Sequence, residues 1–589
     1  MKELLRDALT DSLKSLEEQY DVDLSTIKIE VKENKEKDFG DFSTNLALVL
    51  SKKLSEQPKK IAEILLGELD KKEFIDSIEI AGPGFINFFL SQTSRTEILK
   101  TVNKEKNKFG FSQKKEAEPD KILIEYVSSN PTGPLHVGHG RGAAFGSVLS
   151  SILRATGNHV DEEYYVNDQG RQIEILSLSV WLRYLMIFNQ ISLFPNNCYQ
   201  GTYIEELAEE LERDYGEKFS ITKEIEDLIS EMLQLDMEEE ALDGLISQSK
   251  EALNESFDEI KSFVLNRILK NIEGDLKDFG VKHNSWFKES TMFRADKDKT
   301  PLIKKALDSL EAKKQLYEKD GALWFKSTDF GDEKDRVVKR ENGATTYFAS
   351  DIAYHANKYD RGYSKIINIW GADHHGYLPR VKAAMSALDE DTDKFEVVFI
   401  QFANLIRNGK KLSMSTRAGE FISLSELIEE VTSEAARFFY INRKGNQHLD
   451  FDLDLAKEQS KDNPLYYVQY AHARICSVFD KLEENKKSYK ESIAMDSLDQ
   501  LNSEQEIEIQ KLLSQFPEVV IRSAANYEPH LICYYLRQLA GTFHSYYNNE
   551  KILVEEESTL QARLFLISAV RQVVFNGLTI LGISAPETM

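Results

Sequence analysis

The pattern of hydrophobic and polar positions is that of alternating strands and helices through the middle of the chain. Between about residues 116 and 435, short β-branched runs such as 122–127, 160–166 and 365–370 are separated by helical spacing. This alternation predicts a doubly wound parallel sheet of the Rossmann type, with its ligand at the carboxyl ends of the strands. A stretch at about 175–290 departs from the alternation and predicts a helical insertion.

The two ends of the chain have different patterns. Residues 1–110 combine amphipathic helical spacing with strand-like runs at 27–31 and 85–90, which predicts a small α/β domain. In 436–589, leucine, tyrosine and phenylalanine recur at three- and four-residue spacing, which predicts an all-α helical-bundle domain. The predicted fold is therefore multidomain α/β, with a Rossmann-type catalytic domain between these two parts.

Composition narrows the class of protein. The chain of 589 residues is 41% hydrophobic and 29% charged, as expected of a globular protein. No apolar segment is expected to reach the roughly 18–20 residues that span a membrane, and the N-terminus lacks an apolar signal core, so a cytoplasmic protein without membrane contact is predicted. Cys198, Cys476 and Cys533 are far apart, which supports neither a disulfide framework nor a zinc site.

The net charge of −25 argues against nucleic-acid binding without excluding it. Binding depends on a local face of the molecule, and net charge is a global sum. Much of the acid lies in one segment, 224–259, which looks like a solvated helical region.

The turn after the strand at 122–127 carries the clearest chemical signal. His136 and His139 stand at the start of a small-residue helix, with Gly138 between them. A helix N-terminus offers free N–H groups and partial positive charge, and imidazoles add donors, so the segment suits a nucleoside triphosphate. From these residues alone, a partial metal site or two core histidines remain alternatives, although no cysteine or carboxylate stands at helical spacing to complete a metal site.

The strand, turn and helix around His136 and His139 resemble the HIGH motif of class I aminoacyl-tRNA synthetases, and motifs elsewhere in the chain support this resemblance. A second loop, 409–419, contains Met414-Ser415, which is similar to the centre of the KMSKS loop of that class. Within the class, the chain resembles the arginyl-tRNA synthetases. The segments that carry this resemblance run from end to end and are 38–42, 84–88, 130–134, 347–354, 371–376, 467–474 and 581–587.

The resemblance implies an ATP-dependent arginine–tRNA ligase. In the implied reaction the carboxylate of L-arginine attacks the α-phosphate of ATP, in a step that depends on tRNA, to give arginyl-adenylate and pyrophosphate. The arginyl group then passes to the terminal adenosine of tRNA(Arg), and AMP leaves. ATP with Mg²⁺ is the implied cofactor, L-arginine and tRNA(Arg) are the implied partners, no zinc is implied, and a monomer is typical of the family.

The same resemblance assigns roles to residues. The catalytic set is His136, His139, Lys411 and Arg417. The ATP-binding set is His136, Gly138, His139, Asp373, His374, His375, Gly376, Met414 and Ser415. The arginine-binding set is Glu125, Asn130, Tyr347, Asp351 and Gln172. The tRNA-binding set is Asn87, Tyr467, Tyr470 and Met589.

Structural roles compete with several of these assignments. The alternative for Glu125 is a surface charge at a strand end, and the alternative for Tyr347 is a core aromatic residue. A turn or capping role is an alternative around Gln172, and tyrosines at helical spacing such as Tyr467 and Tyr470 are commonly core residues.

The loop at 409–419 departs from the family pattern. Ser413 and Thr416 stand where lysines usually flank Met-Ser, so Lys410, Lys411 and Arg417 are the cations that remain. The favoured interpretation is an active enzyme in which Lys411 or Arg417 supplies the missing charge. The alternative is a synthetase paralogue that binds RNA or a small ligand without catalysis. Another class I specificity is opposed by the added N-terminal domain and by the Asp351/Tyr347 pair.

Overall fold

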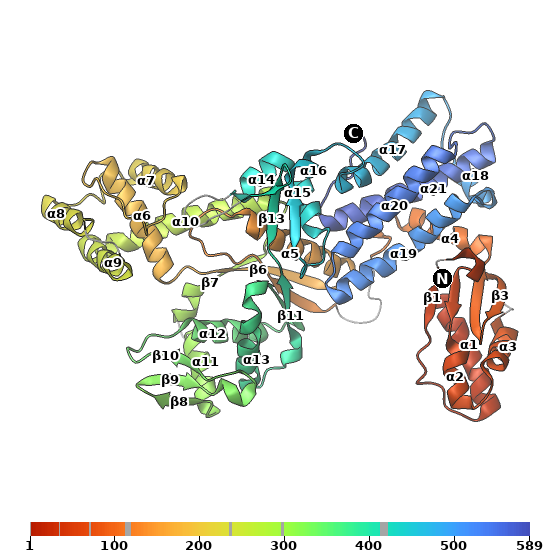
Figure 1. Cartoon of the computed structure of the whole chain (residues 1–589), viewed down its shortest axis with the longest axis horizontal. Coiled ribbons are helices and arrows are strands. Elements are labelled where there is room, and N and C mark those ends of the chain that lie inside the picture. The colour runs from red at the N-terminus through yellow and green to blue at the C-terminus, as the bar shows by residue number, and fades with distance from the viewer. Residues whose placement is uncertain are drawn as a thin grey trace.

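The computed structural model describes residues 2–34, 36–69, 72–111, 119–234, 238–295, 300–412 and 422–589. Met414, Ser415 and Arg417 of the predicted site lie outside these residues. Figure 1 shows an elongated molecule with the parallel sheet near its middle. The insertion helices lie at one end, and the C-terminal bundle and the N-terminal domain lie at the other.

A five-stranded parallel sheet forms the centre of the molecule, in the order β12-β11-β5-β6-β7. Its strands are β5 (Lys121–Glu125), β6 (His159–Val166), β7 (Ser285–Lys288), β11 (Lys365–Gly371) and β12 (Phe395–Ile400). The chain leaves β5 toward β6 through α5 (Val137–Ala155) and leaves β11 toward β12, on the other side, through α13 (Leu378–Ala387). Strands β5 and β11 therefore flank the switch point where ligands bind in such sheets.

Both faces of this sheet are buried. On β5, Ile122 and Ile124 pack in the core cluster that includes α5, whereas Leu123 packs in the cluster of α12 (Tyr347–Asp360) and α13. Successive side chains of a strand point to opposite faces, so a continuous apolar run is what a strand covered on both sides requires.

The expectation that about 175–290 forms a helical insertion is wrong at its end, where the chain forms the strand β7. It pairs in parallel with β6, from Glu163–Ser285 to Val166–Lys288, and so belongs to the main sheet. The run has four residues and three of them are only half-buried, which leaves almost no hydrophobic pattern to detect. The insertion helices are α6 (Arg171–Ile187), α7 (Thr202–Tyr215), α8 (Lys223–Met232), α9 (Glu239–Leu253) and α10 (Glu255–Asp278).

A small three-stranded sheet and one helix follow the insertion and precede α12. The elements are α11 (Leu302–Ala312), β8 (Leu316–Lys319), β9 (Ala322–Phe325) and β10 (Arg336–Lys339). The strands are antiparallel in the order β10-β9-β8. This small sheet is separate from the parallel sheet.

The N-terminal domain is an antiparallel sheet, in the order β1-β2-β4-β3, packed with helices. Its elements are α1 (Lys2–Tyr20), β1 (Val31–Glu33), β2 (Phe42–Thr44), α2 (Leu46–Leu54), α3 (Pro58–Leu69), β3 (Ile75–Ala81) and β4 (Phe85–Leu90). Helix α4 (Gln92–Glu105) follows, and its Leu99 and Val102 pack in the main core cluster of the molecule. The strand expected at 27–31 begins only at Val31. Residues 27–30 are not part of a strand, and the Thr44 hydroxyl donates to the Glu30 carbonyl at 2.7 Å.

The C-terminal part is a helical bundle preceded by a second three-stranded sheet. The bundle consists of α17 (Pro464–Glu484), α18 (Glu491–Asp496), α19 (Glu504–Asn526), α20 (His530–Asn549) and α21 (Glu557–Leu581), and the helices before it are α14 (Leu424–Val431), α15 (Ser433–Ile441) and α16 (Leu453–Lys457). The sheet has the order β14-β13-β15, formed by β13 (Ala403–Arg407), β14 (Lys410–Lys411) and β15 (Leu449–Asp452). Strand β15 corrects the expectation of a wholly helical region after 435.

Helix α21 contradicts the expectation that no apolar segment is long enough to span a membrane. By length and composition it is apolar enough to cross a membrane, but 78% of its apolar stretch is buried within the protein. It contacts α17, α18, α19 and α20. Its composition is therefore that of the central core helix of the bundle.

The buried side chain of Arg437 joins four distant parts of the chain. Its guanidinium donates to the carbonyls of Leu581 on α21 and of Phe279 and Gly280 after α10, and to the Ser147 hydroxyl on α5. All of these partners are neutral, and burial lowers the pKa of Arg437 to about 10. The guanidinium therefore binds the bundle to the helix that begins at the two histidines.

Replacing Arg437 by methionine is expected to destabilise the protein by about 2–4 kcal/mol, because several buried carbonyl oxygens lose their donors at once. Arg522 is exposed on α19, and its replacement by methionine provides a control that is expected to stay within about 0.5 kcal/mol of the wild type. Chemical unfolding followed by circular dichroism measures both. Equal stability of the two variants would contradict the structural role of Arg437.

Candidate active site

The two predicted catalytic histidines cap the N-terminus of α5. His136 is the N-cap residue, and its Nδ1 accepts a hydrogen bond from the Gly138 backbone N–H at 3.1 Å. His139 Nδ1 accepts one from the His136 backbone N–H at 3.3 Å, and the two rings stack with centroids 3.8 Å apart. A Cβ on residue 138 would lie 2.8 Å from the His136 ring, so glycine allows the ring to fold over the helix end.

Burial keeps both imidazoles neutral at pH 7. It lowers the pKa of His136, and it lowers the pKa of His139 to about 3, with the neighbouring His136 as a second cause. A neutral ring whose Nδ1 accepts a hydrogen bond carries its proton on Nε2. Each ring can therefore donate from Nε2, beside the N–H groups of a helix N-terminus, and this combination suits phosphate oxygens.

The segment 413–421, which contains the predicted Arg417, lies outside the described residues, and the chain that follows it lies next to the histidines. Before it, Lys410 and Lys411 form β14, and both side chains are exposed. After it, the backbone of Val137 donates to the carbonyl of Ile422 at 3.1 Å, and Ser423 forms a bridge with His136. The chain thus leaves the loop directly beside the start of α5.

A second predicted ATP-binding segment follows β11. Asp373, His374, His375 and Gly376 are exposed in the 3₁₀ helix η5 (Ala372–Tyr377), which begins where β11 ends. The His375 ring stacks on Phe399 of β12 with centroids 3.6 Å apart. Because β5 and β11 are parallel neighbours, η5 and the turn that leads to His136 leave the same edge of the sheet.

The structure also brings together the residues predicted to bind arginine. Tyr347 and Asp351 are one turn apart on α12, and Tyr347 is 62% exposed, which rules out a core role. The Tyr347 hydroxyl lies next to Gly170, 2.9 Å from the position of a Cβ there. Helix α6 starts after Gly170 and carries Gln172, whose Oε1 accepts a hydrogen bond from Asn130 Nδ2 at 3.0 Å.

The carboxylate of Asp351 lies among other acidic groups. Burial, together with the charges of Glu125 and Glu289, raises its pKa to about 7. A hydrogen bond donated by the Tyr377 hydroxyl and the charge of Lys358 oppose this rise. An Asp351 with this pKa is poised to become ionised when a cation binds beside it.

Glu125 is buried and not a surface charge. Its side chain accepts hydrogen bonds from the fully buried Lys358 Nζ and, at 3.0 Å, from the Ser128 hydroxyl. Lys358 Nζ also donates to Asn368 Oδ1 at 2.8 Å. Sequence reasoning missed Lys358, although it lies seven residues, or two helical turns, after Asp351 on α12.

Three family descriptions match the chain in succession. Residues 2–90 match an arginyl tRNA synthetase N terminal domain, residues 99–452 match the tRNA synthetases class I (R), catalytic domain, and residues 468–589 match a DALR anticodon binding domain. The chain belongs to the arginyl-tRNA synthetases.

Curated relatives support this arginyl-tRNA synthetase assignment over the full length. The arginine–tRNA ligase of Legionella pneumophila (strain Paris) is 46% identical over 589 residues, which are 100% of this chain and 98% of that protein. That of Nitrosomonas europaea is 48% identical over 567 residues, 96% of this chain and 95% of the relative. The solved Thermus thermophilus arginyl-tRNA synthetase is similar with a TM-score of 0.72 at 22% identity, covering 100% of both chains, which shows the shared fold.

The predicted tRNA-binding residues of this arginyl-tRNA synthetase differ in exposure. Met589 is 51% exposed at the C-terminus. Tyr467 and Tyr470 are half-buried on α17, and the Arg474 guanidinium lies over the Tyr470 ring at 4.5 Å. Asn87 is only 4% exposed on β4, which leaves its side chain little surface to offer an RNA.

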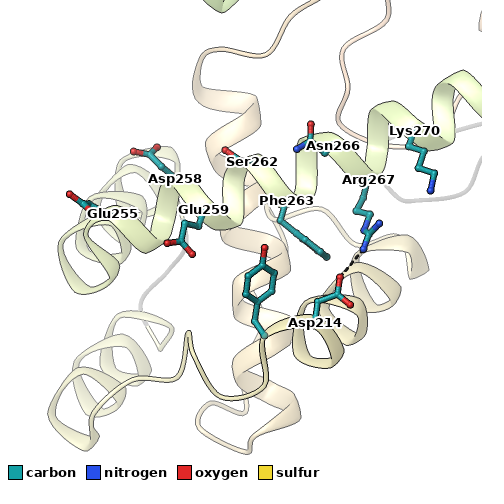
Figure 2. Close-up of a pocket in the computed structure, with 10 residues that line it drawn as sticks. Asp214, Glu255, Asp258, Glu259, Ser262, Phe263, Asn266, Arg267 and Lys270 are labelled. Atoms are coloured by element: carbon teal, nitrogen blue, oxygen red, sulfur yellow. Dashed lines mark hydrogen bonds and ion pairs between the residues drawn. The ribbon is translucent and has the colours of Figure 1, made fainter.

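A large pocket in the described part of the synthetase lies away from these residues, in the insertion. Figure 2 shows it against α10 and the end of α7, with an ion pair between Asp214 and Arg267 at 2.7 Å. Its volume is about 740 Å³, and Glu255, Asp258 and Glu259 line it. An acidic lining opposes an anionic ligand, so the size of this pocket does not make it the ATP site.

Proposed function

We propose that this arginyl-tRNA synthetase activates L-arginine with ATP at the carboxyl ends of β5 and β11 and transfers it to tRNA(Arg). The observation that carries the proposal is that one edge of the sheet has both a group of hydrogen-bond donors suited to an anion and an acidic group suited to a cation. Neutral imidazoles at a helix N-terminus offer donors for phosphates, and the carboxylate of Asp351, among other acidic groups, suits a cationic side chain. The relatives named above are arginine–tRNA ligases along their whole length, which gives no support to an inactive paralogue.

The ATP half of the site positions phosphates and neutralises charge. His136 and His139 donate through Nε2 to the phosphate oxygens, while Gly138 keeps the helix end accessible. Asp373, His374, His375 and Gly376 lie beside the nucleoside on η5, and Met414 and Ser415 complete the binding loop. Such a reaction depends on electrostatic stabilisation and positioning, with no covalent step on the protein.

The arginine half of the site recognises a planar cation. Asp351 accepts the guanidinium in bidentate geometry, and the exposed Tyr347 closes the same side. Glu125, held by Lys358, attracts the α-amino group. Asn130 and Gln172, already joined by a hydrogen bond, shape the rest of the pocket. The arginine carboxylate then points toward the ATP half, where it attacks the α-phosphate.

Three parts of the chain have different roles in this proposal. Residues 116–435 catalyse, residues 436–589 bind the anticodon region, and residues 1–110 contact another part of the tRNA. The RNA-contacting residues in this scheme are Tyr467, Tyr470 and Met589, and the nearly buried Asn87 is left out of it. The enzyme acts as a monomer in the cytoplasm and needs no membrane.

Mg²⁺ enters this site with ATP. It prefers substrate phosphates together with one or two carboxylates over an all-protein cage, and when bound it neutralises phosphate charge. Asp373 fits this chemistry, because its carboxylate is largely exposed at the end of β11. The residues that the structure describes contain no cluster of three or more His, Cys, Asp or Glu that could hold a metal by itself.

Aminoacylation of a tRNA(Arg) transcript with labelled arginine tests the proposed function. Attachment of arginine, and of no other amino acid, is expected, with AMP and pyrophosphate as products. Attachment of a different amino acid would overturn the specificity, and a folded enzyme that attaches none would overturn the activity.

Replacing Lys411 by alanine is expected to lower the rate of arginine activation by about 10²-fold, because a cation opposite the histidines stabilises the developing phosphate charge. Lys410→Ala is the matched control, since Lys410 is the neighbouring exposed residue of β14. Arg417→Ala measures the second candidate cation. Unchanged activation rates in both Lys411→Ala and Arg417→Ala would show that neither residue replaces the missing lysines of the loop.

A further inference from the structure

Tyr377 contacts the proposed arginine-binding carboxylate from a separate element. Its hydroxyl donates a hydrogen bond to Asp351 Oδ2, and in the described part of the chain it is the sole hydrogen-bond donor to that carboxylate. Asp351 lies on α12, whereas Tyr377 is the last residue of η5. The hydroxyl therefore connects the segment proposed to bind ATP with the one proposed to bind arginine.

The Tyr377 ring is held in place by its neighbours. Phe348 of α12 and Trp370 of β11 pack edge-on against it, with centroid distances of 6.4 and 6.0 Å. The Arg380 guanidinium lies 5.4 Å from the centre of the ring. A tyrosine fixed by two aromatic rings presents its hydroxyl at a defined point at little further entropic cost.

The groups that face Asp351 carry more negative than positive charge. Glu125 on β5 and Glu289 on the 3₁₀ helix η3 (Glu289–Phe293) both raise the pKa of Asp351. Lys358 on α12 lowers it, but this ammonium group is already paired with Glu125. In the absence of substrate, the Tyr377 hydroxyl is the main neutral group that favours the ionised carboxylate.

We propose that Tyr377 is a positioning residue for arginine recognition, whose hydroxyl orients the Asp351 carboxylate and keeps it ionised for the guanidinium. The inference rests on the proposed role of Asp351 as the arginine-binding carboxylate. Tyr377 acts through Asp351, and a protonated or rotated carboxyl group loses the bidentate contact that distinguishes a guanidinium from other side chains.

The direction in which removal of the Tyr377 hydroxyl changes the pKa of Asp351 can be predicted. The Tyr377 hydrogen bond lowers the pKa of Asp351, so Tyr377→Phe shifts this pKa upward from about 7. At pH 7 a larger fraction of Asp351 is then protonated, and KM for arginine is expected to rise about tenfold. As pH increases to 9 the carboxyl group ionises in both proteins, so the difference in KM shrinks.

The test measures KM for arginine from pH 6 to pH 9 in the pyrophosphate-exchange assay with tRNA present. The matched control is Tyr359→Phe, because Tyr359 packs in the same aromatic cluster but donates to the Asp391 carbonyl at 3.1 Å. Tyr359→Phe is expected to follow the wild type at every pH. The increase in thermal unfolding midpoint caused by arginine gives a second measure of binding that does not depend on turnover.

The outcomes separate this inference from the proposed function. A KM for Tyr377→Phe that equals the wild-type value throughout would overturn the role of Tyr377, and a KM that exceeds it by one constant factor at all pH values would overturn the claim that the hydroxyl keeps Asp351 ionised. Asp351→Asn is measured alongside. If Asp351→Asn leaves KM for arginine unchanged, the proposed arginine site fails; if it abolishes arginine binding while Tyr377→Phe matches the wild type, only the inference about Tyr377 fails.

Discussion

Replacement of His139 by asparagine is expected to lower the rate of arginine activation by roughly 10²–10³-fold, the usual cost of removing one donor to a developing oxyanion. The asparagine Oδ1 stands where His139 Nδ1 accepts the His136 backbone N–H, so the helix cap is retained. What asparagine lacks is a donor at the position of Nε2. The variant therefore separates phosphate binding from folding of the helix end.

His139→Gln is the matched control for this prediction, because its side-chain amide places an N–H near the position of the imidazole Nε2. It is expected to keep a larger part of the activity than His139→Asn. Since burial lowers the pKa of His139 to about 3, the ring should stay neutral from pH 6 to pH 9, and its contribution should not change across that range. Single-turnover formation of arginyl-adenylate measures the effect, and equal rates for both variants would contradict the donor role.

Replacement of Asp351 by asparagine is expected to lower kcat/KM for arginine by roughly 10³-fold, because the guanidinium would enter a buried site without its charge partner. The effect should fall on arginine, while KM for ATP changes little. Asparagine has nearly the same volume, so packing around α12 is preserved.

Asp360→Asn provides the control for Asp351→Asn. Asp360 is the exposed last residue of the same helix, paired with Lys305 on the surface. It is expected to behave as the wild type, since surface ion pairs contribute little. Steady-state kinetics with arginine as the varied substrate distinguish the two. An Asp351→Asn enzyme with normal kcat/KM for arginine would show that the guanidinium binds elsewhere.

Local patterns predicted the framework of the site well. The β-branched run at 122–127 forms most of β5, which ends at Glu125, and the small-residue helix with its histidines forms α5, because both signals are contained in neighbouring residues. The fold class is confirmed, including the parallel sheet, the added N-terminal domain and the helical bundle. The roles of Asp351, Tyr347 and the histidines came from the family resemblance and stay predictions.

Features that depend on distant contacts could not be predicted. Lys358 and Glu125 are 233 residues apart, and only the folded chain shows that they form a buried pair. Tyr377 follows a recognised motif, but nothing in the sequence indicates that its hydroxyl reaches Asp351 on another element. Strand β7 owes its existence to pairing with β6, since its own four residues carry almost no pattern.

The exchange of pyrophosphate into ATP, driven by arginine, tests the central claim most directly. The purified chain is assayed with each amino acid in turn, in the presence and absence of tRNA(Arg). Rapid exchange with arginine alone among the amino acids, and only when tRNA(Arg) is present, is the predicted result. No exchange in correctly folded enzyme with tRNA(Arg), or exchange driven by another amino acid, would contradict the claim that this site activates arginine.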